Sequence, residues 1–560
     1  MGFVEEEIAR FWSELLGVTT VAPESRFARL GGAADTAARL SDRVDEELGV
    51  RVPAGELLDA DTLEAMGALV RAAMEAPRNR PAPGAGPGEG PAATGAEPAA
   101  TGPRPGARDE RPVLSFGQQR LWFMQQIDPG TTLYNVPTVL HLRGPLDPAA
   151  LGAALDALVA RHEVLRTTYA APGGRPYQVV APPAPVPLPY TDVSGHPEPA
   201  AEAGRLADAE ARWVFDLAAA PPLRARLVRV ADREHRLVLT FHHIAVDGWS
   251  LDVLHRELGA LYGAATGRTP APPGPDLQYA DYAAWQRARL DGPVLDDLVG
   301  HWRAVLGDDP QALAVPTDRP RPASRGFRGA VARRELGPEL LGRLREFCRN
   351  ERVTPYMAAL AGFDALLAGW SGARDITVGT PVAGRTRPEL EHLVGCLINM
   401  VPVRVRLDGA PSFRELVAAV RTAVLDASAH QDLPFDKLVE ALVTRRTRDF
   451  LPVFRVMFSY LRERENPRFP GLDSCVVDLT GPEDTAKYDL SLYAEECGDR
   501  LALTLEYDTD LFTPDTPAAL LAAYERTLHE AIASPGDPVA DPWPARPGAP
   551  GTERSPHRDR

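Results

Sequence analysis

A run of proline, glycine and alanine divides the chain and so sets how it can fold. Residues 77–110, PRNRPAPGAGPGEGPAATGAEPAATGPRPGARDE, contain no large apolar side chain and cannot bury enough surface to order themselves. We predict a disordered linker between a small unit, residues 1–76, and a large unit, residues 111–540. A second polar, proline-rich stretch, residues 541–560, is predicted to be a disordered tail.

Composition limits the classes of function. The chain has 560 residues, too many for one core, and a formal net charge of −16, which argues against nucleic acid or an anionic membrane as partner. No apolar run has membrane-spanning length, and the acidic start MGFVEEEIARFW is unlike a signal peptide. The four cysteines stand far apart without a CxxC pair, so we predict neither a zinc site nor a disulfide framework. We expect a cytoplasmic protein.

The N-terminal unit has the periodicity of helices. Ile8, Phe11, Trp12 and Leu15 recur at helical spacing before Gly17, and residues 36–49 and 63–74 form two more amphipathic stretches. This pattern predicts a small bundle of three or four helices.

The segment HHIAVDGWS, residues 242–250, joins a strand pattern to a helix pattern. Upstream, Leu237, Leu239, Phe241 and His243 alternate onto one strand face, with His242 on the other. Downstream, leucines 251, 254, 258 and 261 mark a helix face, for which Ser250 is the predicted N-cap. The sequence therefore predicts strand, sharp turn and helix, an arrangement that can stabilise charge developing on a substrate.

This segment suggests chemistry for two of its residues. An apolar surrounding would lower the pKa of His243 and keep its imidazole neutral and able to accept a proton. Asp247 either orients an imidazole directly or holds the turn through an ion pair with a distant arginine. Adjacent strand histidines face opposite ways and no third ligand follows at suitable spacing, so we predict no metal here.

The stretch SRFARLGGAADTAARL, residues 25–40, resembles the signature of carrier proteins from nonribosomal peptide synthetases. In carriers a serine after the glycine pair bears a phosphopantetheine arm, and that position falls on Ala34. Thr36 lies inside the expected helix and Ser25 lies before the glycines, so neither replaces the missing hydroxyl. The resemblance implies a helical bundle with no covalently bound cofactor.

The large unit is similar to the condensation domains of nonribosomal peptide synthetases. HHIAVDG fits their HHxxxDG motif, which they share with chloramphenicol acetyltransferase, and five or more further blocks follow in the family's order. The resemblance implies an α/β (α+β) fold of two acyltransferase-like lobes in a V, residues 111–290 and 291–540, with a tunnel between them. The matching blocks are residues 114–137, 161–169, 279–286, 378–404, 431–442 and 506–512.

The resemblance also implies roles for individual residues. His243 would accept the amine proton or stabilise the tetrahedral intermediate, and Asp247 would pair with Arg385 of the AGR segment. Gly248 would permit the turn, and His242 would pack on the other strand face. Arg161 and Arg166, from RHEVLRTTY, would either line the tunnel or form a solvated helix end.

The blocks indicate a domain that accepts an L-configured donor, although GCLINM and FRVMFSYLRERE depart from the family's usual runs and indicate an unusual acceptor. We find no adenylation block or thioesterase motif, and so expect a stand-alone enzyme that receives its thioester from the phosphopantetheine of an acyl- or peptidyl-carrier protein in trans. The second substrate would be an amine, free or carrier-bound. Ester formation with an alcohol and a non-catalytic docking role are the alternatives.

Overall fold

The computed structural model describes residues 3–16, 18, 21–22, 25–48, 52–75, 102–106, 110–322, 324–407, 409–443, 451–462, 466–478 and 484–539. Most of the predicted linker, and all of the predicted tail, lie outside these residues. Among the described helices, none combines the length and the apolar character needed to cross a bilayer.

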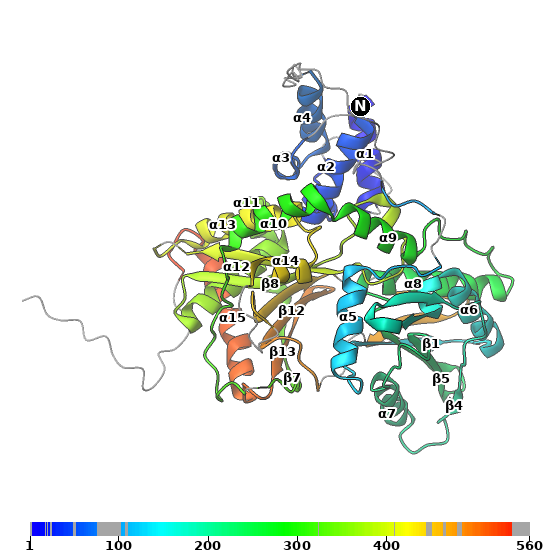
Figure 1. Cartoon of the computed structure of the whole chain (residues 1–560). Helices are drawn as coiled ribbons and strands as arrows, with labels where there is room; N and C mark the ends of the chain where they lie inside the picture. The colour runs from blue at the N-terminus through cyan, green and yellow to red at the C-terminus, as the bar shows by residue number, and fades with distance from the viewer. Residues whose placement is uncertain are drawn as a thin grey trace, which may run out of the picture.

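The N-terminal unit is the predicted helical bundle. Its core is made by the residues that carry the helical periodicity, since Ile8, Phe11 and Trp12 are fully buried against Leu40 and Leu63. Figure 1 shows the bundle above two larger lobes that stand side by side. The bundle consists of α1 (Phe3–Leu16), α2 (Ala34–Leu48), α3 (Ala54–Ala60) and α4 (Leu63–Glu75).

The N-lobe is built on a five-stranded sheet in the order β11-β1-β6-β5-β4. Alternation along β6 places Leu237, Leu239 and Phe241 in the core beneath α6 and α8, as predicted, while α7 covers the opposite face. The strands are β1 (Asn135–Arg143), β4 (Tyr190–Asp192), β5 (Leu223–Ala231), β6 (Glu234–His242) and β11 (Asp473–Asp478), with a small hairpin of β2 (Thr167–Ala170) and β3 (Tyr177–Val180). The helices are α5 (Phe116–Ile127), α6 (Pro148–Arg161), α7 (Pro199–Ala211), α8 (Gly248–Ala265) and α9 (Tyr279–Arg289).

The C-lobe is built on a six-stranded sheet in the order β7-β13-β12-β10-β8-β9. Its central helix, α12, is buried around most of its circumference because it packs against α11, α13, α15 and the sheet. The strands are β7 (Gly329–Leu336), β8 (Asp375–Val382), β9 (Asn399–Arg406), β10 (Val456–Leu461), β12 (Leu490–Cys497) and β13 (Arg500–Asp508). The helices are α10 (Gly292–Leu306), α11 (Pro338–Glu351), α12 (Pro355–Ser371), α13 (Phe413–Ala429), α14 (Phe435–Leu442) and α15 (Asp515–Ala533).

Two segments of the C-lobe sequence cross into the N-lobe. Strand β11 pairs antiparallel with β1, and the segment around Leu390, Leu393 and Leu397 packs into the N-lobe core. The predicted division after residue 290 falls between α9 and α10, where Asp291 caps α10. The chain therefore has the predicted α/β class, but its lobes are interlocked in a way that contiguous boundaries do not describe.

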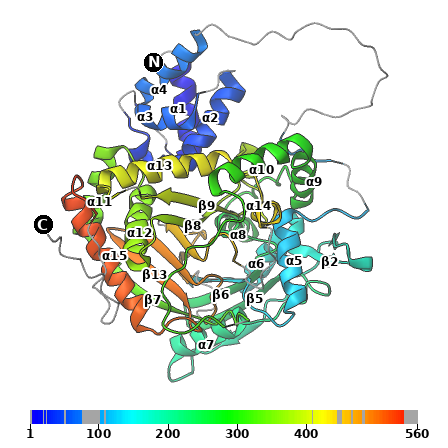
Figure 2. The ribbon, with the colours of Figure 1, turned by 60° about the vertical axis from the view of Figure 1, so that its left-hand side comes forward.

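The bundle rests on the C-lobe side of the molecule. Figure 2 shows it above α13, and α2 contacts this helix directly. Arg421 of α13 forms an ion pair with Asp59 at 2.5 Å, and Arg39 of α2 forms one with Glu391. The guanidinium of Arg39 also lies 5.6 Å from the ring centre of Trp249. The bundle is thus held against both lobes.

Candidate active site

The predicted strand, turn and helix are present around the two histidines. Strand β6 ends at His242, and α8 begins at Gly248. The N-cap is Asp247 and not Ser250, because the Asp247 carboxylate accepts a hydrogen bond from the Ser250 backbone N–H at 2.9 Å. Ser250 instead occupies the first turn, where its hydroxyl donates to the same carboxylate at 2.8 Å.

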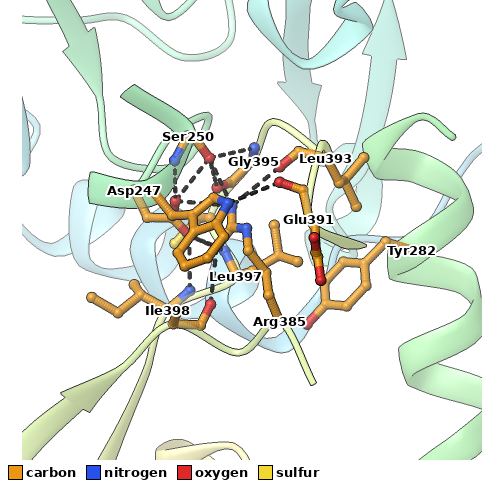
Figure 3. Close-up of polar contacts among 12 residues, drawn as sticks. Asp247, Ser250, Tyr282, Arg385, Glu391, Leu393, Gly395, Leu397 and Ile398 are labelled. Carbon is orange, nitrogen blue, oxygen red and sulfur yellow. Dashed lines mark hydrogen bonds and ion pairs between the residues drawn. The ribbon is translucent and has the colours of Figure 1, made fainter. Parts of the chain in front are cut away.

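Asp247 and Arg385 form a buried ion pair that joins the two lobes (Figure 3). Arg385 Nη1 lies 2.8 Å from Asp247 Oδ2, and Nη2 lies 3.0 Å from Oδ1, so the contact is bidentate. Backbone N–H groups of Leu397 and Ile398 donate to Oδ2 at 2.9 and 3.1 Å. Together with Ser250, these donors make six hydrogen bonds to one carboxylate that is 2% exposed. The ion pair implied by the resemblance is therefore present.

The environment fixes Asp247 as an anion. Burial alone would raise its pKa, but the charge and hydrogen bonds of Arg385 and the hydrogen bonds from Ser250 lower the pKa below its ordinary value. Among the described residues, its hydrogen-bond donors do not include His243. Of the two alternatives left open by the sequence, the contacts favour the ion pair over a triad.

His243 lies immediately after β6 and is a partly exposed residue. Its backbone N–H donates to the Tyr134 carbonyl at 2.8 Å, and its Nδ1 lies 3.8 Å from Cys396 Sγ. Burial, reinforced by the charge of Lys487, lowers the pKa of His243 to about 4. The imidazole is therefore neutral near pH 7 and able to accept a proton.

His242 has the surroundings of a packing residue. Its ring lies edge-on to Phe215, with ring centres 5.9 Å apart, and 6.3 Å from that of Tyr134. Its Nδ1 accepts a hydrogen bond from the Ile244 backbone N–H at 3.1 Å, and burial lowers its pKa to about 3. His242 is thus enclosed by aromatic side chains, whereas the His243 ring lies beside Cys396.

Two cavities meet beside the ion pair. The larger, about 1200 Å³, is lined by Asp247, Gly248 and Arg385 and reaches the bundle at Gly31 and Ala33. The smaller, about 50 Å³, is lined by Cys396, the neighbour of His243, and by residues of α5, α9 and α14. Gly384, Thr386, Ile398 and Gln431 line both cavities. The two cavities therefore adjoin each other along this segment.

The loop before α2 lines the larger cavity at Gly31 and Ala33. The predicted arm position, Ala34, is the first residue of α2. The Thr36 hydroxyl is 2.5 Å from the Ala33 N–H and 2.9 Å from the Ala33 carbonyl, while Ser25 Oγ accepts from the Ala22 N–H at 2.8 Å. Both alternative hydroxyls are therefore engaged with nearby backbone, and Ala34 itself carries no hydroxyl.

Two sequence expectations require correction. Arg161 belongs to neither cavity, because its guanidinium donates to Glu257 at 2.9 Å and to the Pro272 carbonyl at 3.1 Å. Burial would raise the pKa of Glu257, but His162 and Arg161 lower it to about 2, so this is a structural ion pair. Gly248 does not have a positive φ, so the turn before α8 does not require the left-handed conformation that glycine allows. Gly248 lines the larger cavity, where a side chain would occupy part of the cavity volume.

Sequence reasoning missed two neighbours of His243. Cys396 was visible only as part of the unusual GCLINM run, and burial raises the pKa of its thiol to about 12, so it stays protonated. Lys487 is one of only two lysines in the chain and lies with its Nζ 5.5 Å from the Tyr134 ring centre. Its pKa is lowered by burial, against the opposing charge of Glu506. The scarcity of lysine was the one sequence signal that could have drawn attention to it.

Two lobes with a histidine at a strand end between them define an acyltransferase-type site. The family model described as "Condensation domain" matches residues 109–547, and one described as "Phosphopantetheine attachment site" matches residues 6–70. The chain belongs to the condensation domain family, whose members form amide bonds in nonribosomal peptide synthesis, and a carrier-type domain precedes that domain.

Similar proteins include large peptide synthetases. Phosphinothricin tripeptide synthetase PhsC of Streptomyces viridochromogenes is 42% identical over 76% of this chain, and malpibaldin synthetase of Mortierella alpina is 35% identical over 96% of it. The chain spans 39% and 9% of their lengths. Among solved structures, the X-domain from teicoplanin biosynthesis has a TM-score of 0.71 at 31% identity, with 78% of this chain and 98% of that chain covered. The first condensation domain of the calcium-dependent antibiotic synthetase has a TM-score of 0.66 at 25% identity, with 77% and 98% covered.

Proposed function

We propose that this chain joins the acyl group of a carrier-bound thioester to the amine of a second substrate, with His243 at the reacting atoms. The observation that supports the assignment best is the neutral imidazole of His243 beside Cys396, a residue that lines the smaller of two cavities with shared lining residues. The amine attacks the thioester carbonyl and passes one proton to His243. The C–S bond then breaks, and the leaving thiolate takes that proton from His243, which gives the amide, a free thiol and a neutral imidazole. Positioning both substrates supplies up to about 7–11 kcal/mol of barrier lowering. Proton transfer adds about 10²–10⁴-fold in rate.

The test is amide formation by wild type and by His243→Ala, followed by mass spectrometry of the product. We expect His243→Ala to lose about 10²–10⁴-fold in rate if the imidazole takes the proton. His196→Ala, a histidine in an exposed loop, is the matched control and should keep full activity. Equal rates for wild type and His243→Ala would refute catalysis at this site.

We also propose that the donor arrives on a different carrier, because the arm position of this bundle holds alanine. Incubation with a phosphopantetheinyl transferase and coenzyme A should leave the intact mass unchanged. Ala34→Ser restores the hydroxyl and is expected to gain the mass of one arm, which verifies that the bundle can be recognised. A modified wild-type chain would contradict the proposal.

The remaining features of the substrates follow from the motif blocks. We propose an L-configured aminoacyl or acyl donor and an amine acceptor, free or carrier-bound. Paired D- and L-aminoacyl thioesters test the donor, and alcohol acceptors test the ester variant, in which His243 would deprotonate a hydroxyl. Preference for the D-donor would overturn the subtype.

One relative favours a docking role as the second candidate. A solved complex of the X-domain and OxyB from teicoplanin biosynthesis has a TM-score of 0.70 and 31% identity to this chain. A docking component would bind a partner protein equally well as wild type and as His243→Ala, and neither would form product. The buried Asp247–Arg385 pair beside open cavities supports the enzyme over the docking component.

A further inference from the structure

A cluster of three potential metal ligands lies between α10 and α13. His301 is on α10, Asp426 is on α13, and His430 directly follows α13, one helical turn from Asp426. One ligand atom from each residue lies within 4.8 Å of the other two. The nearest contacts are His301 Nε2 to Asp426 Oδ2 at 3.2 Å and His430 Nδ1 to Asp426 Oδ1 at 3.6 Å. His301 and Asp426 lie far apart in the sequence, so no local spacing marks the three residues as a group.

The hydrogen bonds of the two rings leave nitrogens available for a cation. His430 Nδ1 lies 2.8 Å from the backbone carbonyl of Asp426, and this contact assigns the proton to Nδ1 and the lone pair to Nε2. Metal-binding histidines commonly donate the second ring N–H to a carbonyl in this way. His301 Nε2 is shielded from solvent and lies 3.2 Å from Asp426 Oδ2, so this nitrogen faces the carboxylate with which it would share an ion.

The charge state of the cluster also suits a cation. The two imidazoles are stacked with ring centres 3.3 Å apart and an interplanar angle of 7°, so two protonated rings would repel each other. Neutral imidazoles and an ionised carboxylate are the protonation states that metal binding requires.

We propose that His301, Asp426 and His430 form a site for a divalent transition-metal ion, with zinc as the first candidate. Two imidazole nitrogens and one carboxylate oxygen are a ligand set typical of zinc, with water in the fourth position, whereas calcium and magnesium prefer oxygen alone. One ion must lie in the plane of both rings, so binding opens the parallel stack. The site goes beyond the proposed acyl transfer and does not depend on it.

The position of the cluster gives the ion a structural consequence. The His430 carbonyl accepts a hydrogen bond from Trp302 Nε1 at 3.1 Å, and the next residue, Gln431, lines both cavities. The Asn399 side-chain amide donates a hydrogen bond to the Gln431 carbonyl at 2.9 Å. An ion bridging α10 and α13 would therefore stiffen the segment where the two cavities meet.

The experiment uses the full chain without an affinity tag, stripped with a chelator and titrated with zinc chloride alone by calorimetry. We expect one zinc ion per chain and a higher melting temperature with zinc. His301→Ala and His430→Ala should each weaken binding at least tenfold, and their circular dichroism reports whether they fold. His529→Ala, an exposed histidine of α15, should bind zinc as wild type does.

Cobalt provides a second readout, because its visible absorption reports the coordination of the ion. Wild type should show a cobalt absorption band that His430→Ala lacks. The absence of stoichiometric zinc in wild type would overturn the proposal, and so would equal zinc affinity in wild type and in folded His301→Ala. Because no substrate enters these measurements, failure here leaves the acyl-transfer proposal untouched, and failure of the acyl-transfer assay leaves the metal site untouched.

Discussion

Replacement of Asp247 with asparagine tests the ion pair that ties the two lobes together. Asparagine keeps the shape of aspartate but turns one oxygen into an NH2 group, which cannot accept hydrogen bonds. Each Asp247 oxygen accepts three hydrogen bonds, so three donors lose their acceptor whichever way the amide turns. One of them is always from Arg385, which is 3% exposed and keeps its charge.

The structure sets the size of the expected loss. An unsatisfied buried donor costs about 1–3 kcal/mol, and an ion left without its buried partner costs about 3–5 kcal/mol. These contributions overlap, so Asp247→Asn should lower the free energy of unfolding by about 3–5 kcal/mol. Urea unfolding, followed by circular dichroism, measures this as a lower midpoint.

Two comparisons make the result specific to the pair. Asp59→Asn removes an exposed partner of Arg421 and should cost no more than about 1 kcal/mol. Combining Asp247→Asn with Arg385→Met should cost less than the sum of the single changes, because the unpaired charge is then gone. A loss below about 1 kcal/mol for Asp247→Asn, or strict additivity with Arg385→Met, would refute the reasoning.

Three further predictions concern His243, the bundle and Arg161. In the folded protein the pKa of His243 is lowered to about 4, so on acidification the unfolded chain takes up this proton first. The free energy of unfolding should therefore fall as the pH drops from about 6.5 towards 4. Urea midpoints that do not change between these pH values would contradict the prediction. Reversing the bundle contacts with Arg39→Glu and Arg421→Glu should detach the bundle and enlarge the radius of gyration in small-angle scattering, whereas an unchanged curve would show that apolar packing holds it. Arg161→Met removes the ion pair with Glu257, so it should lower the melting temperature while leaving KM for the donor unchanged. A raised KM would indicate that Arg161 contacts the substrate.

Local patterns were enough to predict much of the fold. The alternation of Leu237, Leu239 and Phe241 requires a strand with one face in the core, and the spacing of Ile8, Phe11 and Trp12 requires a helix buried on one side. Both were confirmed because side-chain period follows directly from backbone geometry. The choice of Ser250 as N-cap was wrong, because α8 begins three residues earlier in the turn, where the Asp247 side chain accepts the Ser250 backbone N–H.

Other features depend on contacts between distant parts of the chain. The sequence by itself determined the helical bundle with alanine at position 34 and the strand, turn and helix around His243, while the division by a linker stays a prediction. Only the tertiary structure decided that β11 joins the N-lobe sheet, that Cys396 and Lys487 neighbour His243, and that His301 meets His430. Periodicity specifies which face of an element is buried, but the partner of that face is set by the packing of the whole chain, which no local pattern records.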